Sequence, residues 1–430
     1  MSKVKAGFAR VCSTPPLGTP MAGYFEPRYA KGVLDDLFVN AVAFEQGEKR
    51  CVVISVDLCG LMNEYVHNYR KIVADYCGIP FEAVIISCTH SHTGPVICDG
   101  WESGTVGNPV YDEWLGICMR DAAKLALEDV CDAEFYAATG EAKGISFVRR
   151  FLMKDGSVLC NPGINNPNVV GPIGEPNETV YLLKIEREAA EDIYIVNYGV
   201  HPDTIGGEYF SADFPGVVRD TIEAAIPDSV CMFIQGPEGD VNHVDVNTEL
   251  KPGKFHAYKM GRTIAGTVLQ ICMDAKPVEV ESLEFVNRNI DIPANKENDR
   301  LEEAKKSLEA EEQGRKEDIT IGRAEALRIV NLADAPDTYP FILSAVKVGN
   351  VVIGGLAGEP FTEIGVRIRE KSPFDMTILC ALTDGGEIYF PTSDAYDGGS
   401  YEVASSYIKR GADNIIVEET LGMFNEIKSK

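Results

Sequence analysis

The sequence lacks the features that mark membrane proteins and disulfide-rich proteins. No segment approaches the roughly 18–20 apolar residues that cross a bilayer, and residues 1–10 lack the apolar core of a signal peptide. None of the 12 cysteines belongs to a CxxC pair, so the sequence indicates neither a zinc ribbon nor a disulfide framework. We therefore expect reduced cysteines, a cytoplasmic location and no insertion into a membrane.

Positive charge is also scarce. The 40 basic residues are outnumbered by 66 acidic ones, and the net charge is −26. Binding to nucleic acid or to anionic lipid needs a basic surface, which argues against both partners. The remaining composition, 45% hydrophobic and 25% charged, is ordinary for a globular protein. A small-molecule substrate is the expected partner, and no feature of the sequence specifies an oligomeric state.

Short apolar runs alternate with helical patterns along the chain. The strand-like runs are 38–44, 51–58, 83–88, 192–200, 230–234, 342–348, 350–357 and 376–382. The helical stretches between them include 62–77, 112–129, 213–225 and 255–273. Strands that alternate with helices predict an α/β fold in layers. Because some strands neighbour each other, as on either side of Gly47, we expect a layered mixed β-sheet core flanked by helices.

One segment differs in composition from the rest. Within residues 294–333, the stretch 296–318 is dense in Glu and Lys, with Leu301, Ala304 and Leu308 at helical spacing. This pattern predicts two surface helices joined near Gly314, with a narrow apolar stripe. We interpret the segment as a charged helical insertion in a single domain that spans residues 1–430.

Histidine is rare, yet two of the six histidines lie two residues apart. His90 and His92 follow the apolar run 83–87, which indicates a buried strand that ends before Gly94-Pro95. Side chains alternate along a strand, so both imidazoles are expected on the same side of its end. Imidazole is a common ligand for zinc-like metals and a proton shuttle near neutral pH. The alternative is a pair of surface loop histidines.

Two further strand ends carry a residue that can bind metal. His201 follows the apolar run 193–200, and Glu359 follows the run 351–357. A catalytic zinc site typically uses three protein ligands and leaves one position open for water. The three strand ends together predict a metal site that contains His90, although each of the three residues on its own could be structural.

These segments occur in an order that resembles one known family. Over nearly its whole length the chain is similar to the catalytic domain of the neutral (alkaline, non-lysosomal) ceramidase family. The segments that carry the resemblance are 7–24, 89–95, 196–202, 211–216, 358–362 and a block with Tyr389, Thr392, Tyr396, Tyr401 and Glu402. The resemblance implies a neutral-ceramidase-like α/β catalytic domain, without the immunoglobulin-like C-terminal domain of the family's longer members.

The resemblance also implies roles for individual residues. It places the family's four zinc ligands on His90, His201, Glu359 and Tyr389, and Zn²⁺ is therefore the expected cofactor. The family's second histidine corresponds to His92, which would hydrogen-bond the reacting carbonyl or move a proton. The active-site arginine corresponds to Arg149, with Arg150 as the alternative, and the last tyrosine of the block corresponds to Tyr401.

Asn242 is the main departure from the family's pattern. The family carries a serine at this position, whereas residues 239–244 here read G-D-V-N-H-V. An amide cannot act as a covalent nucleophile, but it can donate a hydrogen bond to an oxyanion. Asp240 could orient His92 or His243, or could simply form a turn. His243 is a further candidate for an acid or base in place of the missing serine.

Three hypotheses follow for the function. We favour zinc-dependent hydrolysis of a carbon–nitrogen (amide) bond, with His92, Asn242, Arg149 and Tyr401 around the reacting group. The charge of −26 argues against ceramide itself and favours a soluble substrate. The second hypothesis is a zinc-dependent lyase or isomerase that acts on a polyol or sugar acid. The third is a non-catalytic protein that uses the zinc pocket to bind a ligand, which would have no need for His92.

Overall fold

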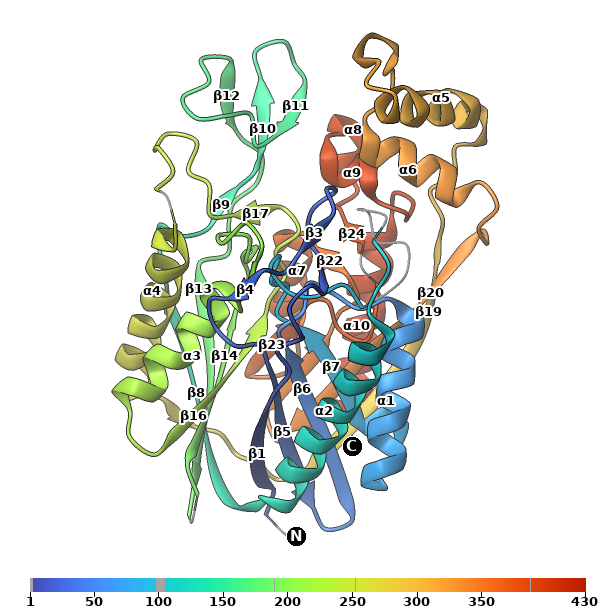
Figure 1. Cartoon of the computed structure of the whole chain (residues 1–430). Coiled ribbons are helices and arrows are strands. Elements are labelled where there is room, and N and C mark those ends of the chain that lie inside the picture. Colours follow the sequence, from blue (N-terminus) through green and yellow to red (C-terminus); the bar gives the residue numbers. More distant parts are fainter. Residues whose placement is uncertain (1–2, 98–104, 189, 252, 387) are drawn as a thin grey trace.

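The structure is a computed structural model that describes residues 3–97, 105–188, 190–251, 253–386 and 388–430. Its largest element is a mixed sheet with the strand order β16-β14-β13-β8-β1-β5-β6-β7, and β18 pairs with β8 (Figure 1). The pairs β14–β16 and β6–β7 at the two ends are parallel, and the pairs between them are antiparallel. The predicted mixed sheet is therefore confirmed. Its strands are β1 (Lys5–Cys12), β5 (Phe38–Gln46), β6 (Lys49–Val56), β7 (Val84–Cys88), β8 (Cys131–Glu141), β13 (Thr179–Arg187), β14 (Asp192–Tyr198), β16 (Ser229–Gln235) and β18 (Lys276–Pro277).

The hairpin of β5 and β6 shows how the sequence sets the register of this sheet. Gln46 pairs with Lys49 across a two-residue turn. The first turn residue, Gly47, has a φ of 62°, a conformation that glycine adopts without steric cost. Both strands are buried along most of their length, which explains why their apolar residues are continuous rather than alternating.

A second sheet lies against the first, and the carboxyl ends of strands from the two sheets come together. Its order is β19-β20-β21-β23, and its members are β19 (Leu283–Pro293), β20 (Thr338–Val348), β21 (Val351–Gly355) and β23 (Met376–Cys380). Side chains from both sheets, such as Ile86 and Ile353, share one hydrophobic core. The Ala381 amide donates to the Gln235 carbonyl at 2.9 Å, directly after β23 and at the end of β16. The carboxyl ends of strands from both sheets are therefore side by side.

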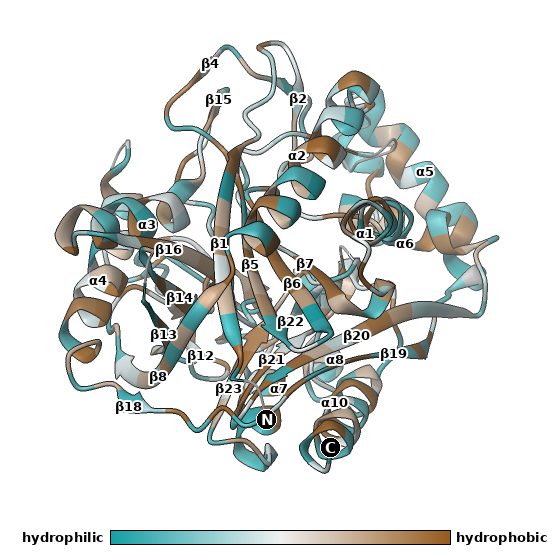
Figure 2. Ribbon diagram, turned by 90° about the horizontal axis from the view of Figure 1, so that it is seen from below, coloured by the Kyte–Doolittle hydropathy of each residue, from teal (hydrophilic) through white to brown (hydrophobic). Residues whose placement is uncertain are grey.

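Helices cover the outer faces of both sheets (Figure 2). The helices α1 and α2 pack on the strands from β1 to β7, α3 and α4 pack on the part with β8, β13 and β16, and α10 packs on β19 and β20. The bounds of these helices are α1 (Asn63–Cys77), α2 (Pro109–Glu128), α3 (Asp213–Ala225), α4 (Phe255–Ile271) and α10 (Ala412–Lys428), and a further helix is α7 (Thr362–Lys371). Within the described ranges, none of the helices combines the length and the apolar character that a bilayer crossing requires.

Local sequence signals set the ends of these helices. The Asn108 side chain accepts hydrogen bonds from the amides of Val110 and Tyr111, and Pro109 occupies the first helical position of α2. An asparagine cap followed by proline is a strong start signal, so α2 begins earlier than the apolar pattern predicts. At the carboxyl-terminal end of α1, Gly78 has a φ of 64° and ends the helix.

The charged segment contains the two expected helices, α5 (Leu301–Glu312) and α6 (Arg323–Leu332). Gly314 lies between them with a φ of 69°, and Ala304 and Ile329 form part of a small apolar contact between the two. Helix α6 also packs on α9 (Tyr401–Ser405). The buried Arg328 on α6 links the two helices, because its Nε donates to the Ala404 carbonyl of α9 at 2.7 Å. The segment therefore reaches the loops above the strand ends.

Short paired segments shape these loops. They are β2 (Pro20–Met21), β3 (Arg28–Tyr29), β4 (Gly32–Val33), β9 (Phe147–Val148), β10 (Arg150–Met153), β11 (Val158–Cys160), β12 (Val169–Pro172), β15 (Tyr209–Phe210), β17 (Val241–Asn242), β22 (Glu359–Pro360), β24 (Tyr389–Phe390) and the helical turn α8 (Ala395–Gly398). Among the pairs are β9–β17, β22–β24, β10–β11 and β10–β12. The pair of β4 and β15 joins the first third of the chain to the middle third.

Candidate metal centre

Two candidate ligands are neighbours in one short parallel pair. Glu359 in β22 and Tyr389 in β24 are direct partners. Gly358, just before β22, has a φ of 60°, and a Cβ there would lie 2.4 Å from the Ile388 carbonyl oxygen. Only glycine allows the chain to turn out of β21 and pass this close to β24. Glycine at position 358, directly before Glu359, is therefore required by the path of the backbone.

His90 lies in a loop rather than at the end of a strand. Strand β7 ends at Cys88, and His90 has a φ of 68°, so the alternation expected for an extended strand does not apply. The conformation is held by the His90 amide, which donates to the Leu58 carbonyl at 2.8 Å. The His90 Nδ1 lies 2.6 Å from the Cys59 carbonyl oxygen. A carbonyl only accepts, so Nδ1 carries the proton and the Nε2 lone pair is free.

His201 is held in the same way. It follows β14, and its amide donates to the Val241 carbonyl at 3.3 Å. Its Nδ1 lies 3.1 Å from the Glu238 carbonyl oxygen. Nδ1 must again be the protonated nitrogen, which leaves Nε2 as a potential metal ligand. A backbone carbonyl at the far nitrogen is a common arrangement in metal-binding histidines.

The free nitrogens converge on the Glu359 carboxylate. Glu359 Oε2 lies 3.1 Å from His201 Nε2 and 3.5 Å from His90 Nε2. This oxygen is buried, yet the geometry gives it no hydrogen bond among the described residues. The Tyr389 hydroxyl lies 3.4 Å from His201 Nε2. Two imidazoles, a carboxylate and a phenol around one point form a ligand set that suits zinc, and the orphaned carboxylate oxygen fits a cation.

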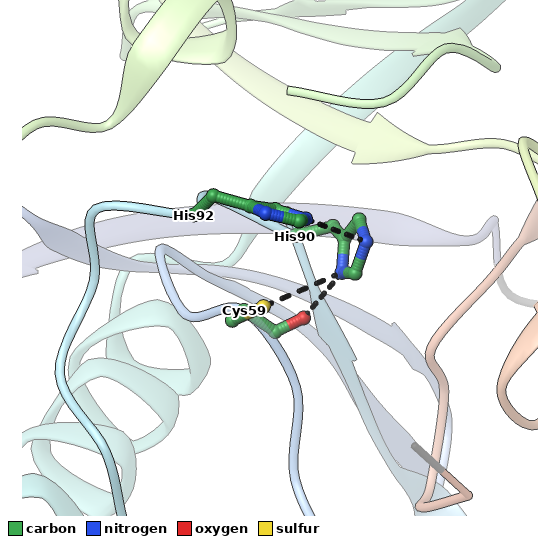
Figure 3. Close-up of side chains that lie close together, drawn as sticks. All are labelled: Cys59, His90 and His92. Atoms are coloured by element: carbon green, nitrogen blue, oxygen red, sulfur yellow. Dashed lines mark hydrogen bonds between the residues drawn. The ribbon is translucent and has the colours of Figure 1, made fainter. Parts of the chain in front are cut away.

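A second group of potential ligands, Cys59, His90 and His92, lies beside the first. Figure 3 shows Cys59 at one edge of the His90 ring and His92 at the other. The Cys59 sulfur is 3.8 Å from His90 Nδ1, which is already occupied by the Cys59 carbonyl. This group therefore lacks a free imidazole nitrogen on the cysteine side. The set of His90, His201 and Glu359 is the better candidate.

The local electrostatics favour a bound cation. Burial lowers the pKa of His201 to about 3, and the positive charge of Arg149 contributes. Burial alone would raise the pKa of Glu359, but the neighbouring His90 and His201 outweigh it and hold this pKa well below its usual value. A neutral His201 beside an ionised carboxylate is the combination that metal binding requires. Burial and the charge of Glu359 raise the pKa of Tyr389 well above its usual value.

Arg149 forms the side of the centre next to Tyr389. Its Nη2 donates to the Gly239 carbonyl at 2.7 Å, and its Nη1 lies 3.3 Å from His201 Nε2. The guanidinium lies 5.2 Å from the ring centroid of Tyr389 and 6.0 Å from that of Tyr401. The two tyrosine rings meet edge to face with centroids 5.6 Å apart. Arg149, Tyr389 and Tyr401 are thus brought together as the sequence motifs imply.

His92 is surrounded by the loop after β2. Its Nε2 lies 3.2 Å from His90 Nε2, and burial, together with the neighbouring His90, holds the pKa of His92 well below its usual value. Arg28 donates to the His92 carbonyl at 2.7 Å. Gly23 has a φ of 98°, and a Cβ there would lie 2.7 Å from the His92 Cβ. The absence of a side chain at Gly23 makes room for His92 beside the ligands.

Asn242 and Asp240 make contacts that their sequence context does not predict. The Asn242 amide nitrogen donates to the Asn161 side chain at 2.9 Å, and its oxygen accepts from the Val244 amide at 2.9 Å. Asp240 Oδ1 accepts from both the amide and the hydroxyl of Thr362, at 2.7 and 2.8 Å. The recorded hydrogen bonds of the Asp240 side chain thus go to Thr362 and not to a histidine. Asp240 fixes the start of α7, directly after the Glu359 segment.

His243 lies at the edge of the centre, close to a second histidine. Its ring centroid is 5.1 Å from that of His256. Burial lowers the pKa of His243 to about 4, against the attraction of Asp203. Its Nδ1 is buried and has no hydrogen-bond partner in the described part of the chain. His243 is therefore a neutral group beside the ligands.

Three residues near the centre carry no clear sequence signal as isolated residues. Glu402 accepts from Arg149 and Arg150 at 2.8 Å each, and Cys59 positions His90 through its backbone. Asp203 Oδ1 lies 3.8 Å from His92 Nδ1 and accepts a hydrogen bond from the Tyr24 hydroxyl. Glu402 is adjacent to Tyr401 in the motif block, which could have identified it. Cys59 and Asp203 lie in loops, and only their distance to the histidines in space reveals them.

Comparison with known proteins identifies the fold. No family model matches the sequence, and no curated protein matches it either. A crystal structure of neutral ceramidase from Pseudomonas aeruginosa is similar, with a TM-score of 0.76 and 17% identity over 99% of this chain and 75% of that chain. A second structure, a ceramidase complexed with C2, gives a TM-score of 0.77 and 16% identity over 100% of this chain and 76% of that one. This chain therefore has the neutral ceramidase fold.

Proposed function

We propose that the protein is a zinc-dependent hydrolase that cleaves an amide bond in a small soluble substrate other than ceramide. The observation that carries the proposal is the convergence of His90, His201 and Glu359. The Nε2 atoms of the two histidines and one unpartnered carboxylate oxygen converge on one buried point. The similar fold of a protein named neutral ceramidase supports amide hydrolysis as the reaction class.

The chain supplies groups for each part of such a reaction. A bound zinc ion would polarise the scissile carbonyl and lower the pKa of a water molecule. In the proposed reaction, His92 Nε2 would take a proton from the attacking water and return it to the leaving nitrogen. Arg149 and Tyr401, which lie beside Tyr389, would stabilise negative charge on the carbonyl oxygen.

Asn242 supports a mechanism without a covalent intermediate. Its amide cannot attack a carbonyl, and both of its polar atoms are engaged, one with Asn161 and one with Val244. One N–H of the amide remains for a substrate oxygen. Direct attack by water fits this arrangement better than a cycle through the protein.

The surroundings of His92 support a polar substrate. Asp203, the Tyr24 hydroxyl and the neutral His243 lie around the centre, and a hydrocarbon chain would leave such groups without partners. The strong negative charge of the chain supports the same conclusion. We therefore place the substrate among small polar amides.

Elemental analysis and a substrate panel test the proposal together. Chelator-treated protein that is reloaded with zinc should hold about one zinc ion per chain, and His90→Ala should lose it. His67→Ala, which replaces an exposed histidine on α1, is the matched control and should keep the metal. The loaded protein should then hydrolyse a small polar amide. Zinc without turnover of any amide or ester, but with turnover of a sugar acid, would favour the lyase or isomerase instead. Failure of the wild type to hold zinc would contradict the proposal.

A further inference from the structure

A cleft of about 1050 Å³ lies behind the wall of the metal centre. It is bounded by the loop 173–177, by α7 and by the beginning of α10. Asp240 and Phe361 contribute to its inner side, but none of the four candidate zinc ligands is among the described residues that line it. The cleft is therefore a separate space that shares only a wall with the metal centre.

Arg369 is the unusual residue in this cleft. Its recorded partners are all neutral: Nε donates to the Thr377 carbonyl at 3.3 Å, and Nη2 donates to the Asn197 side-chain oxygen at 3.2 Å. The guanidinium lies over the Tyr181 ring, 4.2 Å from its centroid. Across the described ranges no ion pair joins it to a carboxylate, and burial lowers its pKa from the usual value. The Arg369 side chain is half-buried, and its guanidinium remains charged without a carboxylate partner among the described residues.

The other arginines of the cleft each pair with a carboxylate. Arg150 donates to Glu402 at 2.8 Å. Arg367, two residues before Arg369 on the same helix, donates to Asp413 at 2.8 Å and to Asn414 at 2.6 Å. Arg369 therefore differs from the other two arginines in having no anionic partner. Its guanidinium is the position in the cleft where a bound anion would find an unpaired positive charge.

The carboxylates of the cleft determine which anion fits. Asp413 is paired with Arg367, and Asp240 Oδ1 accepts two hydrogen bonds from Thr362. The remaining carboxylates are exposed and lie where solvent screens them; they are Glu175, Glu363, Glu370 and Asp394. These charges would repel a multiply charged anion more strongly than a singly charged one.

We propose that this cleft binds a small monocarboxylate, with its carboxylate on the Arg369 guanidinium. The planar fork of arginine matches the two oxygens of a carboxylate. The Tyr181 hydroxyl accepts from the Asn177 amide at 3.3 Å, which leaves its own proton to donate to the ligand. An occupant would contact α7, which begins just after the Glu359 segment, so the site is connected to the metal centre through one helix.

Arginine side-chain NMR tests this site directly, with acetate as the probe. Protein with ¹⁵N-labelled arginine gives a separate Nε signal for each ordered guanidinium, and Arg369→Met identifies the signal of Arg369 by its loss. Arg369→Lys serves the same purpose if the methionine variant fails to fold. Titration with sodium acetate, against sodium chloride at equal ionic strength, should move the Arg369 signal in a saturable way.

Arg367 is the matched control, because it lies in the same cleft but is already paired with Asp413. Its signal should move less than that of Arg369. Inorganic phosphate should move the Arg369 signal less than acetate does at the same concentration. An Arg369 signal that does not respond to acetate, or that responds no more than the Arg367 signal, would overturn the proposal. A stronger response to phosphate would overturn the preference for a monocarboxylate.

Discussion

The Arg149 Nε donates to Glu402 Oε1 at 2.8 Å, and 253 residues separate the two along the chain. Glu402 is fully buried, and its second oxygen accepts from Arg150, also at 2.8 Å. One carboxylate thus pairs with two adjacent arginines and fixes Arg149 beside Tyr389. This contact ties the strands β9 and β10 to α9, which carries Tyr401.

Replacement of Glu402 by alanine should destabilise the protein severely. It would leave two buried guanidinium groups without their anion, and the loss of one member of a buried ion pair typically costs about 3–5 kcal/mol. Urea unfolding measures the change in the free energy of unfolding. The control is Asp397→Ala, which removes an exposed partner of Arg410 and should leave stability almost unchanged. Equal effects of the two substitutions would contradict the role of Glu402.

The buried pair of Asp57 and Arg219 should support metal binding from a distance. Arg219 donates to both oxygens of Asp57, at 2.8 and 2.6 Å, and Asp57 also accepts from the Thr89 hydroxyl at 3.1 Å. The pair therefore holds the segment that carries His90. Arg219→Met should lower the free energy of unfolding by about 3–5 kcal/mol and weaken the affinity for zinc.

Competition with a zinc-binding dye measures that affinity, at a temperature where the variant is still folded. Lys71→Met removes one partner of an exposed pair on α1 and is the control. The prediction fails if Arg219→Met is destabilised but binds zinc as tightly as the wild type.

Acid should destabilise the metal-free protein. The pKa values of His201 and His243 are about 3 and about 4 in the folded state, whereas an unfolded histidine titrates near pH ~6.5. Below that pH the unfolded state binds more protons than the folded state, so stability is lost as the pH falls toward these folded values. The urea midpoint of chelator-treated protein should therefore decrease from about pH 7 to about pH 5.

The variant His243→Gln isolates one contribution to this slope. It removes one of the two depressed groups, so its urea midpoint should depend less steeply on pH than that of the wild type. A slope identical to that of the wild type would show that His243 titrates normally in the folded protein.

An alanine at position 23 should disturb His92 without removing a ligand. A Cβ at Gly23 would lie 2.7 Å from the His92 Cβ, whereas at Gly18 it would meet nothing within 4 Å. Both glycines have positive φ, so both alanine variants should lose about 1–2 kcal/mol of stability from backbone strain. Only Gly23→Ala should also shift the NMR signals of the His92 ring and reduce amide hydrolysis, with zinc retained. Equal hydrolysis by both variants would show that His92 tolerates the displacement.

Much of the fold can be predicted from the sequence where burial is continuous. Strands such as β6 and β7 consist of apolar residues that are buried on both faces, so their runs are visible without any knowledge of their neighbours. Strands that are only partly buried are harder to recognise in the sequence. Strand β8 exposes alternate residues and carries Glu134 and Glu141, which hides it among loops. Helix α10 has an apolar stripe that includes Ile416, which is a periodic signal present in the sequence.

The candidate site likewise contains some residues that the sequence predicts and others that it does not. Each of His90, His201 and Glu359 follows a recognisable apolar strand, so the shared context predicts their meeting. Cys59 and Asp203 act on the histidines from loops, and no periodicity places them. Their positions follow from how the two sheets close against each other, which depends on contacts between residues far apart in sequence.

The order in which the ligands appear along the chain bears on its biosynthesis. During translation His90 emerges first and Tyr389 nearly last, and the pairing of Glu359 with Tyr389 requires both short strands to be complete. A nascent or truncated chain therefore displays histidines without the carboxylate and phenol that complete the set. Under the proposed function, zinc would therefore bind only after both short strands have formed, and it would stabilise the fold, since binding free energy adds to folding free energy. A shortage of zinc would then leave folded chains that unfold more readily.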